Sequence, residues 1–192
     1  MPGEENKVQF NIKNLHYAPM TATGDTPTWD TPVKVPGTVS LTLEPVGEVN
    51  KFYADGIVYY QTTSNSGYEG DLKVARFPVE MRKAVWKENE VETDFVMIEN
   101  ANIEPVPCAL LFQIDGDKTG DYYLLYNCTL TRPSIEAETT TESKEVKTQT
   151  CTVSAAPLAN GNVLARTTAQ SPDEIKNNWF TEVYEKPASP AA

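Results

Sequence analysis

Residues 108–134 read CALLFQIDGDKTGDYYLLYNCTLTRPS and carry the strongest structural signal in the chain. They begin with an apolar run at residues 109–112 and continue through a turn rich in Gly and Asp at residues 115–121. Apolar side chains then recur at every second position: Tyr122, Leu124, Tyr126, Cys128 and Leu130. A turn of this composition between two such runs predicts a β-hairpin.

The same alternation predicts further strands, so the fold class is mainly β with antiparallel sheets. The expected strands cover residues 8–12, 39–43, 57–60, 72–77, 94–99, 108–113, 148–155 and 163–168. Two short helices are also expected. One begins after Phe77, with Pro78 in its first turn. The other follows the capping-box pattern of residues 171–174, with Ile175 and Trp179 on one face.

A chain of 192 residues is long enough for one domain with a real core. That domain is expected at residues 7–185, after a flexible N-terminus at 1–6 and before a disordered tail at 186–192. Within it, residues 18–37 carry four prolines and are predicted to form a long loop or arm. Residues 134–149 are polar and predict either a marginal two-sided hairpin or a solvated loop.

Charge limits the partners of this protein. The net charge is −11 and Lys and Arg do not cluster, which argues against stable binding to nucleic acid or to a membrane surface. The acidic first five residues do not resemble a signal peptide, and no apolar segment is long enough to span a bilayer.

Chemistry-bearing motifs are sparse, so neither catalysis nor a cofactor is expected. His16 is the single histidine and the three cysteines form no Cys-x-x-Cys pair, which argues against a metal site or a Ser/His/Asp site. Residues 115–120 imitate half of a calcium loop, but position twelve would be Tyr126, where a glutamate is required. Cys108, Cys128 and Cys151 are expected to be buried thiols, with a disulfide between two of them as the alternative.

Several phrases, in order, resemble one protein family. Besides the hairpin at 108–134, they are NLHYAPMT at 14–21, VPGTVSL at 35–41, FYADG at 52–56, GYEGDL at 67–72 and NWF at 178–180. Together they resemble the major tail proteins of long-tailed phages that infect Gram-positive bacteria, of the phi-thirteen type. The resemblance spans roughly residues 7–184. One departure is MRKAVWKE at 81–88, where the family resemblance predicts a short helix ending in an Ile-Leu-Gly turn.

The resemblance implies a β-sandwich or barrel subunit with a flanking helix that forms the tail tube of a siphophage. Six subunits would form a ring, and stacked rings would make a channel for genome ejection. The implied partners are further copies of the chain, a tape measure protein, and tail terminator and baseplate proteins. Double-stranded DNA would pass through without tight binding. The protein would be made in the host bacterial cytoplasm and end in the virion.

Three sets of residues are candidates for assembly roles. A conduit for DNA should repel phosphate, so the lumen-facing candidates are acidic. These are Glu136, Glu138, Glu142 and Glu145. The candidates for contacts between rings lie in the proline-rich segment: Pro19, Thr21, Pro27, Trp29 and Pro32. The candidates for strands shared between subunits are Tyr59, Tyr60, Tyr122 and Tyr123.

Two rival functions remain at the level of sequence. One is the tube of a related injection or secretion device, which would lack the phrases quoted above. The other is a carbohydrate-binding or receptor-binding β-sandwich of the virion, which requires exposed aromatic side chains. The two Tyr-Tyr pairs and Trp29 could serve that purpose.

Overall fold

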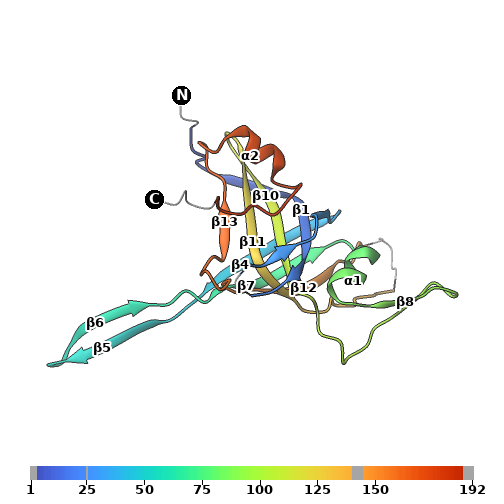
Figure 1. Ribbon diagram of the computed structural model, residues 1–192, viewed down its shortest axis with the longest axis horizontal. Coiled ribbons are helices and arrows are strands. Elements are labelled where there is room, and N and C mark those ends of the chain that lie inside the picture. Colours follow the sequence, from blue (N-terminus) through green and yellow to red (C-terminus); the bar gives the residue numbers. More distant parts are fainter. Residues whose placement is uncertain (1–3, 25, 140–144, 188–192) are drawn as a thin grey trace.

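The computed structural model describes residues 4–24, 26–139 and 145–187. The protein is mainly β with antiparallel pairing throughout, which confirms the predicted fold class (Figure 1). Its strands are β1 (Gln9–Ala22), β2 (Thr28–Trp29), β3 (Val33–Lys34), β4 (Thr38–Val46), β5 (Val49–Ala54), β6 (Ile57–Thr63), β7 (Gly67–Val74), β8 (Asn89–Val91), β9 (Val96–Ile98), β10 (Cys108–Gly116), β11 (Gly120–Leu130), β12 (Gln149–Ala155) and β13 (Leu164–Arg166). The helices are α1 (Val79–Val85) and α2 (Asp173–Asn178).

One large sheet forms the body, in the order β2-β1-β10-β11-β12-β7-β4, with β3 beside β1 and β13 beside β11. The sheet curls, so β4 at one end of this order comes near β1 toward the other end. The concave side encloses the first core, to which Leu15, Leu72, Leu110, Leu125 and Val153 each contribute from a different strand. Curling lets a single sheet bury one face against itself, as in a barrel.

The β10–β11 hairpin is buried on both faces, which explains its long apolar run. Leu110 and Phe112 point into the first core, whereas Ala109 and Leu111 point into a second core on the opposite face. The apolar residues that alternate along β11 do not all point to the same side of the sheet. Leu124 and Tyr126 belong to the second core, but Cys128 and Leu130 belong to the first. A register shift between the Cys108–Cys128 and Leu110–Leu125 pairs supplies the extra residue.

Helix α1 closes one end of the first core. It begins directly after Pro78, near the expected position, and buries Met81 and Val85. Trp86 follows it and is fully buried, with its ring edge against Phe77 at a centroid separation of 5.2 Å. The indole Nε1–H donates to the carbonyl oxygens of Leu130 and Thr131 at 3.2 and 3.0 Å. Trp86 lies within residues 81–88, where the sequence differs from the phrase expected from the family resemblance.

Helix α2 and the segment after it cover the second core (Figure 1). The expected helix is present, with Ile175 partly buried and Trp179 buried against this core. The predicted capping box is wrong, because no side chain caps the helix. The Ser171 hydroxyl instead accepts a hydrogen bond from the Thr168 N–H at 2.9 Å, which closes the preceding turn.

The prediction of a long loop at residues 18–37 is wrong for much of that segment. Strand β1 continues to Ala22 because Ala18, Pro19 and Met20 are buried against the sheet. The chain then returns along β1, where β2 and β3 pair with it. The prolines do not prevent this pairing, since Pro27, Pro32 and Pro36 lie outside the short strands.

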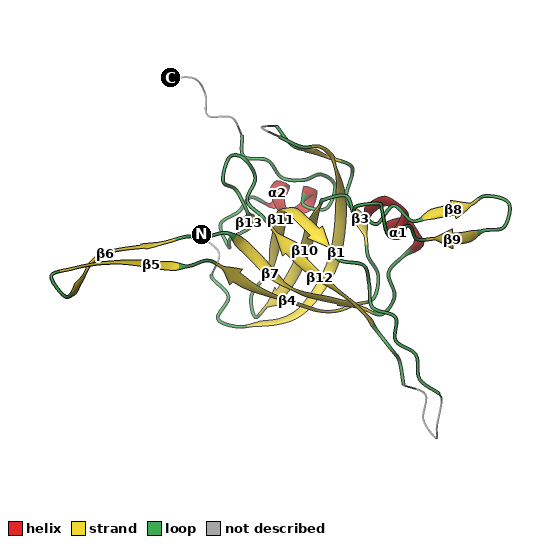
Figure 2. Ribbon diagram, turned by 90° about the horizontal axis from the view of Figure 1, so that it is seen from below, coloured by secondary structure: helices red, strands yellow, loops and turns green. Residues whose placement is uncertain are grey.

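Two hairpins leave the body on opposite sides (Figure 2). The longer is β5–β6, which continues from the end of β4 and returns into β7. The shorter is β8–β9, where the strand expected at 94–99 is reduced to Val96–Ile98. The strand expected at 72–77 is displaced: β7 begins at Gly67, where it pairs with β4, and ends at Val74.

The polar segment 134–149 is held at its base. The Ser134 N–H donates to the Thr150 carbonyl at 2.8 Å, and the Thr150 N–H donates to the Ser134 hydroxyl at 3.0 Å. Its described residues before β12 are not in strands. The described part of this segment therefore extends from the sheet without forming the two-sided hairpin.

All three cysteines are buried and carry free thiols, as expected. Cys108 and Cys128 are direct cross-strand partners, and all three lie in the first core. Burial raises the pKa of Cys108 and of Cys151 to about 12 and that of Cys128 well above its usual value. They therefore act as small apolar side chains that fill the core.

Candidate assembly surfaces

The β5–β6 hairpin exposes most of its apolar side chains. Every residue of β6 is exposed, as is every residue of β5 except Ala54. The largest exposed side chains include Tyr59, 71% exposed, and Phe52, Tyr53, Ile57 and Tyr60, each more than 60% exposed. Phe52 lies opposite Tyr60 and Tyr53 lies opposite Val58, so both faces of the hairpin carry apolar side chains.

Such a hairpin is unstable as an isolated element in water. A two-stranded sheet is marginal by itself, and clustered apolar side chains on a surface mark an interaction site. Each of its strands also has one unpaired backbone edge, because β5 and β6 form a separate two-stranded sheet. The hairpin therefore offers apolar side chains and backbone hydrogen-bonding groups to a partner.

Sequence reasoning found the strand at 57–60 and named Tyr59 and Tyr60, but it missed β5 and the hairpin. The signal was available in the dipeptide Asp55-Gly56, which sits between two apolar runs. Both residues have positive φ, 53° and 77°, as a two-residue type I′ turn requires.

The β8–β9 hairpin carries a second exposed apolar tip. Phe95 is 78% exposed and adopts a left-handed backbone with φ of 55°. Val96 and Ile98 beside it are about half exposed. An exposed aromatic held in this unfavourable backbone region marks a second candidate contact site.

The convex face of β4, β7 and β12 is polar and acidic. Asp71 on β7 lies directly between Thr42 and Thr152 in register, and its Oδ1 accepts a hydrogen bond from the Thr152 hydroxyl at 3.2 Å. Two residues along β7, on the same face, Glu69 lies opposite Glu44. The carboxylates of Glu44, Glu69 and Asp71 are all exposed. Lys73, two residues after Asp71 on β7, is an exposed cation beside them. The sheet thus presents a regular acidic surface.

The acidic residues predicted to face a lumen lie elsewhere, on the 134–149 segment. Glu136, Glu138 and Glu145 are exposed, whereas Glu142 lies outside the described residues. Lys147 contacts both Glu138, at 2.5 Å, and Glu145, at 3.4 Å. These ion pairs offset part of the negative charge of the segment.

The predicted inter-ring residues divide by burial. Pro19 and Pro32 are buried within the subunit, Pro27 and Trp29 are half-buried, and Thr21 is exposed. The Trp29 indole donates to the Tyr126 carbonyl at 3.1 Å and its ring packs against Tyr126. This segment therefore anchors to the second core, and Thr21 is the most accessible of its five candidates.

The four predicted interface tyrosines also separate into two pairs. Tyr59 and Tyr60 are exposed on the β5–β6 hairpin, whereas Tyr122 and Tyr123 have partners within the subunit. Tyr123 stacks on Phe112 at 5.2 Å, and Tyr122 packs against Phe180 at 5.6 Å. Strand β11 pairs with β10 on one side and with β13 on the other at Tyr123.

His16 packs beneath the C-terminal segment. Its ring stacks on Phe180 at 4.5 Å, and Nδ1 lies 2.8 Å from the Asn14 carbonyl oxygen. Burial lowers the pKa of His16 below its ordinary value, so the neutral ring is favoured at pH 7. The histidine therefore serves the packing of the second core.

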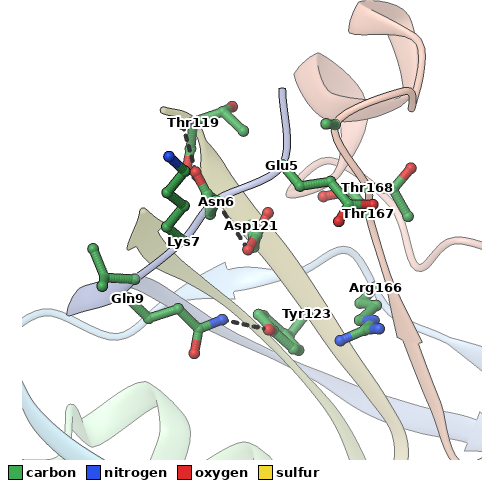
Figure 3. A pocket seen from close by; sticks show the side chains of 12 residues that line it. Glu5, Asn6, Lys7, Gln9, Thr119, Asp121, Tyr123, Arg166, Thr167 and Thr168 are labelled. Atoms are coloured by element: carbon green, nitrogen blue, oxygen red, sulfur yellow. Dashed lines mark hydrogen bonds between the residues drawn. The ribbon is translucent and has the colours of Figure 1, made fainter. Parts of the chain in front are cut away.

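The N-terminal segment, expected to be flexible at residues 1–6, is fastened to the β10–β11 turn at Asn6 (Figure 3). The Asn6 Nδ2 donates to the Thr119 carbonyl and to Asp121, and Oδ1 accepts from the N–H groups of Lys118 and Thr119, all between 2.8 and 3.0 Å. The Lys7 N–H donates to Asp117, which lowers the pKa of that carboxyl. A polar pocket of about 430 Å³ lies between this segment and β13.

A groove of about 900 Å³ runs between the start of β1 and the start of β4, and most of its lining residues are apolar, with Gln9, Asn11, Ser40 and Arg166 as the polar ones. Phe10 and Ile12 line it from β1, and Val39, Leu41 and Leu43 line it from β4. Phe10 and Val39 are 69% and 50% exposed at its rim. Residues 9–14 of β1 pair with β10 only, and β4 pairs with β7 only, so unpaired strand edges border the groove.

The described part of the chain contains no group of three or more His, Cys, Asp or Glu side chains arranged to hold a metal ion. Within the same residues, neither helix has the length and apolar character needed to cross a bilayer.

Comparisons with known proteins give a weak structural likeness and no family assignment. No protein-family model matches the chain, and a search of curated proteins finds no match. Among solved structures, the chain is similar to the tube-terminating cap of the anti-feeding prophage, determined by cryo-EM. The TM-score is 0.33 with 15% sequence identity, over 86% of this chain and 96% of that chain. A likeness of this size carries no argument about function.

Proposed function

We propose that this chain is a structural protein of a phage tail, and specifically the major tail tube subunit of a siphophage. The observation that carries the proposal is the β5–β6 hairpin, whose apolar side chains are exposed on both faces and whose strand edges are unpaired. In a monomer these apolar side chains and open strand edges would stay exposed to water, whereas a subunit of an assembly can bury them against a neighbour. The ordered family phrases at residues 14–180 point to the tail tube as that assembly.

The placement of the hairpins supports a repeating assembly. The β5–β6 and β8–β9 hairpins project from opposite sides of the body and differ in sequence (Figure 2). Contacts made through different surfaces of identical subunits are heterologous, and they either close into rings or propagate into filaments. A tube of stacked rings uses both kinds of contact, in six-membered rings according to the resemblance.

We assign the lumen to the convex face of β4, β7 and β12, in place of the 134–149 segment. A channel wall must be continuous, and a sheet with Glu44, Glu69 and Asp71 in adjacent rows provides a regular repelling surface. Carboxylates facing a phosphate polymer prevent it from adhering. On the 134–149 segment, by contrast, Lys147 pairs with two of the glutamates.

The remaining assignments follow from this role. The subunit would be made in the bacterial cytoplasm and reside in the virion tail. It would bind further copies of itself and assemble with the tape measure, terminator and baseplate proteins. It would touch double-stranded DNA only in transit, and it would need no cofactor and catalyse no reaction.

Negative-stain electron microscopy of the purified protein across a concentration series, with and without its tape measure protein, tests the proposal. Hollow tubes or six-membered rings are expected. Dispersed monomers under all these conditions, baseplate proteins included, would contradict it.

A second candidate is a virion module that binds carbohydrate or a receptor. The exposed Phe52, Tyr53, Tyr59 and Tyr60 favour it, because aromatic faces stack on sugar rings. Glycan-array binding that is lost in a Tyr59→Ser variant, together with no tubes at any concentration, would favour this candidate.

A further inference from the structure

We propose that the apolar groove between β1 and β4 receives the β5–β6 hairpin of a second copy of this chain. The inference rests on the proposed function and deepens it by naming the two surfaces that meet where one subunit contacts another. The receiving surface comprises the exposed rim residues Phe10 and Val39 and the partly buried Ile12, Leu41 and Leu43.

The groove and the hairpin both carry few charges. More than a fifth of the whole chain is charged, at 22%, yet Arg166 is the one charged residue that lines the groove. The hairpin is similarly neutral, with Lys51 and Asp55 as its charged residues between Val49 and Thr63. Two surfaces that carry so few charges can pack together with little cost from burying unpaired charge.

Both surfaces also have unsatisfied backbone hydrogen-bonding groups. The groove is bordered by the unpaired edges of β1 and β4, and β5 and β6 each have an unpaired outer edge. A strand that adds to an open sheet edge gains main-chain hydrogen bonds while its alternate side chains enter pockets. The hairpin can thus extend the sheet and place aromatic side chains in the groove at the same time.

The subunit's own hairpin does not occupy the groove. The hairpin leaves from the end of β4 and extends away from the body (Figure 1). Val39, by contrast, lies near the start of that strand. No residue of β5 or β6 lines the groove. The two surfaces therefore meet only between copies, and their contact is heterologous.

Cysteine cross-linking between differently tagged copies tests the contact. One copy carries Tyr59→Cys on the hairpin and the other carries Val39→Cys at the groove rim. The three native thiols are buried, so mild oxidation reports on the introduced pair. A matched control replaces Val39→Cys with Ser154→Cys, an exposed position on β12 away from the groove.

The expected result is a disulfide-linked pair of copies with Val39→Cys that is lost with Ser154→Cys. Tubes that form without this cross-link would overturn the groove assignment while leaving the tail tube proposal standing. Failure of both the cross-link and assembly, with the tape measure protein present, would overturn both.

A second comparison does not depend on introduced thiols. Val39→Asp places a charge at the groove rim, and Thr42→Asp places the same charge on the opposite face of β4. Loss of assembly is expected for Val39→Asp alone. Equal behaviour of the two folded variants would argue against docking in the groove.

Discussion

Asn6 shows how one side chain can fix the N-terminal segment against the body. Its amide makes four hydrogen bonds to the β10–β11 turn, and Gly116 leaves room for it. A Cβ at Gly116 would come within 2.1 Å of the Asn6 side chain. The turn and the asparagine are therefore matched in shape as well as in hydrogen bonding.

Replacing Asn6 with Ala should lower the free energy of unfolding by about 1–2 kcal/mol, because the turn loses its partly buried partners. Urea denaturation followed by tryptophan fluorescence measures the change. Asn11→Ala, at an exposed position further along the same segment in β1, should be nearly neutral. If both variants lost the same stability, the Asn6 contacts would have no special role.

The buried thiols predict how stability depends on pH. In the unfolded chain they ionise near their ordinary pKa of 9.0, whereas in the folded protein the pKa of Cys108 and Cys151 is about 12. Between these values the unfolded state binds fewer protons, so stability is complete below about pH 9 and falls as the pH rises toward 12. Denaturation midpoints from about pH 8 to pH 11 should decline, and less steeply in a Cys108→Ala variant. A midpoint independent of pH in this range would contradict this explanation.

Among the elements, the β5–β6 hairpin is expected to matter for assembly but not for the stability of the folded subunit. Tyr59→Ser with Tyr60→Ser removes two exposed aromatic side chains, so the free energy of unfolding should change by no more than about 0.5 kcal/mol. Assembly should be lost, because the hairpin is the proposed contact. Sedimentation velocity measures oligomer formation, with Val146→Ser as a control at another exposed apolar position. Normal tubes from the double variant would rule out a role for these tyrosines.

Sequence periodicity predicted most of the strands because the sheet has one face toward a core and one toward solvent over much of its area. The prediction was accurate where that pattern held, as in β4 and β12. It was less accurate where tertiary contacts determine the structure. Strand β1 continues through Pro19 because the sheet covers it, and α2 begins without the expected cap.

The candidate surfaces were harder to predict than the strands. Tyr59 and Tyr60 were found because they are aromatic, but nothing local to a strand distinguishes them from Tyr122 and Tyr123, which pack internally. Likewise, Glu44, Glu69 and Asp71 are far apart in sequence, and only the register of β4 with β7 places them on one face. Surfaces assembled from distant strands leave no compact motif.

At the scale of the whole molecule, the acidic sheet face predicts weak interaction with DNA. Glu69→Lys with Asp71→Lys should create salt-sensitive binding to double-stranded DNA in assembled tubes, because cations replace counterions on the phosphates. Fluorescence anisotropy of a labelled duplex measures this binding. Glu136→Lys with Glu138→Lys, on the other acidic segment, is the matched control. Binding by the control alone would return the lumen assignment to residues 134–149.

In the proposed tube, the acidic face of β4, β7 and β12 points inward and the hairpins reach neighbouring copies. Cryo-EM reconstruction of the assembled tail tube tests it most directly. The predicted density has Glu44, Glu69 and Asp71 lining a central channel, with each β5–β6 hairpin packed on another subunit. Density in which the chain forms no tube, or forms one with this acidic face on the outside, would contradict the account.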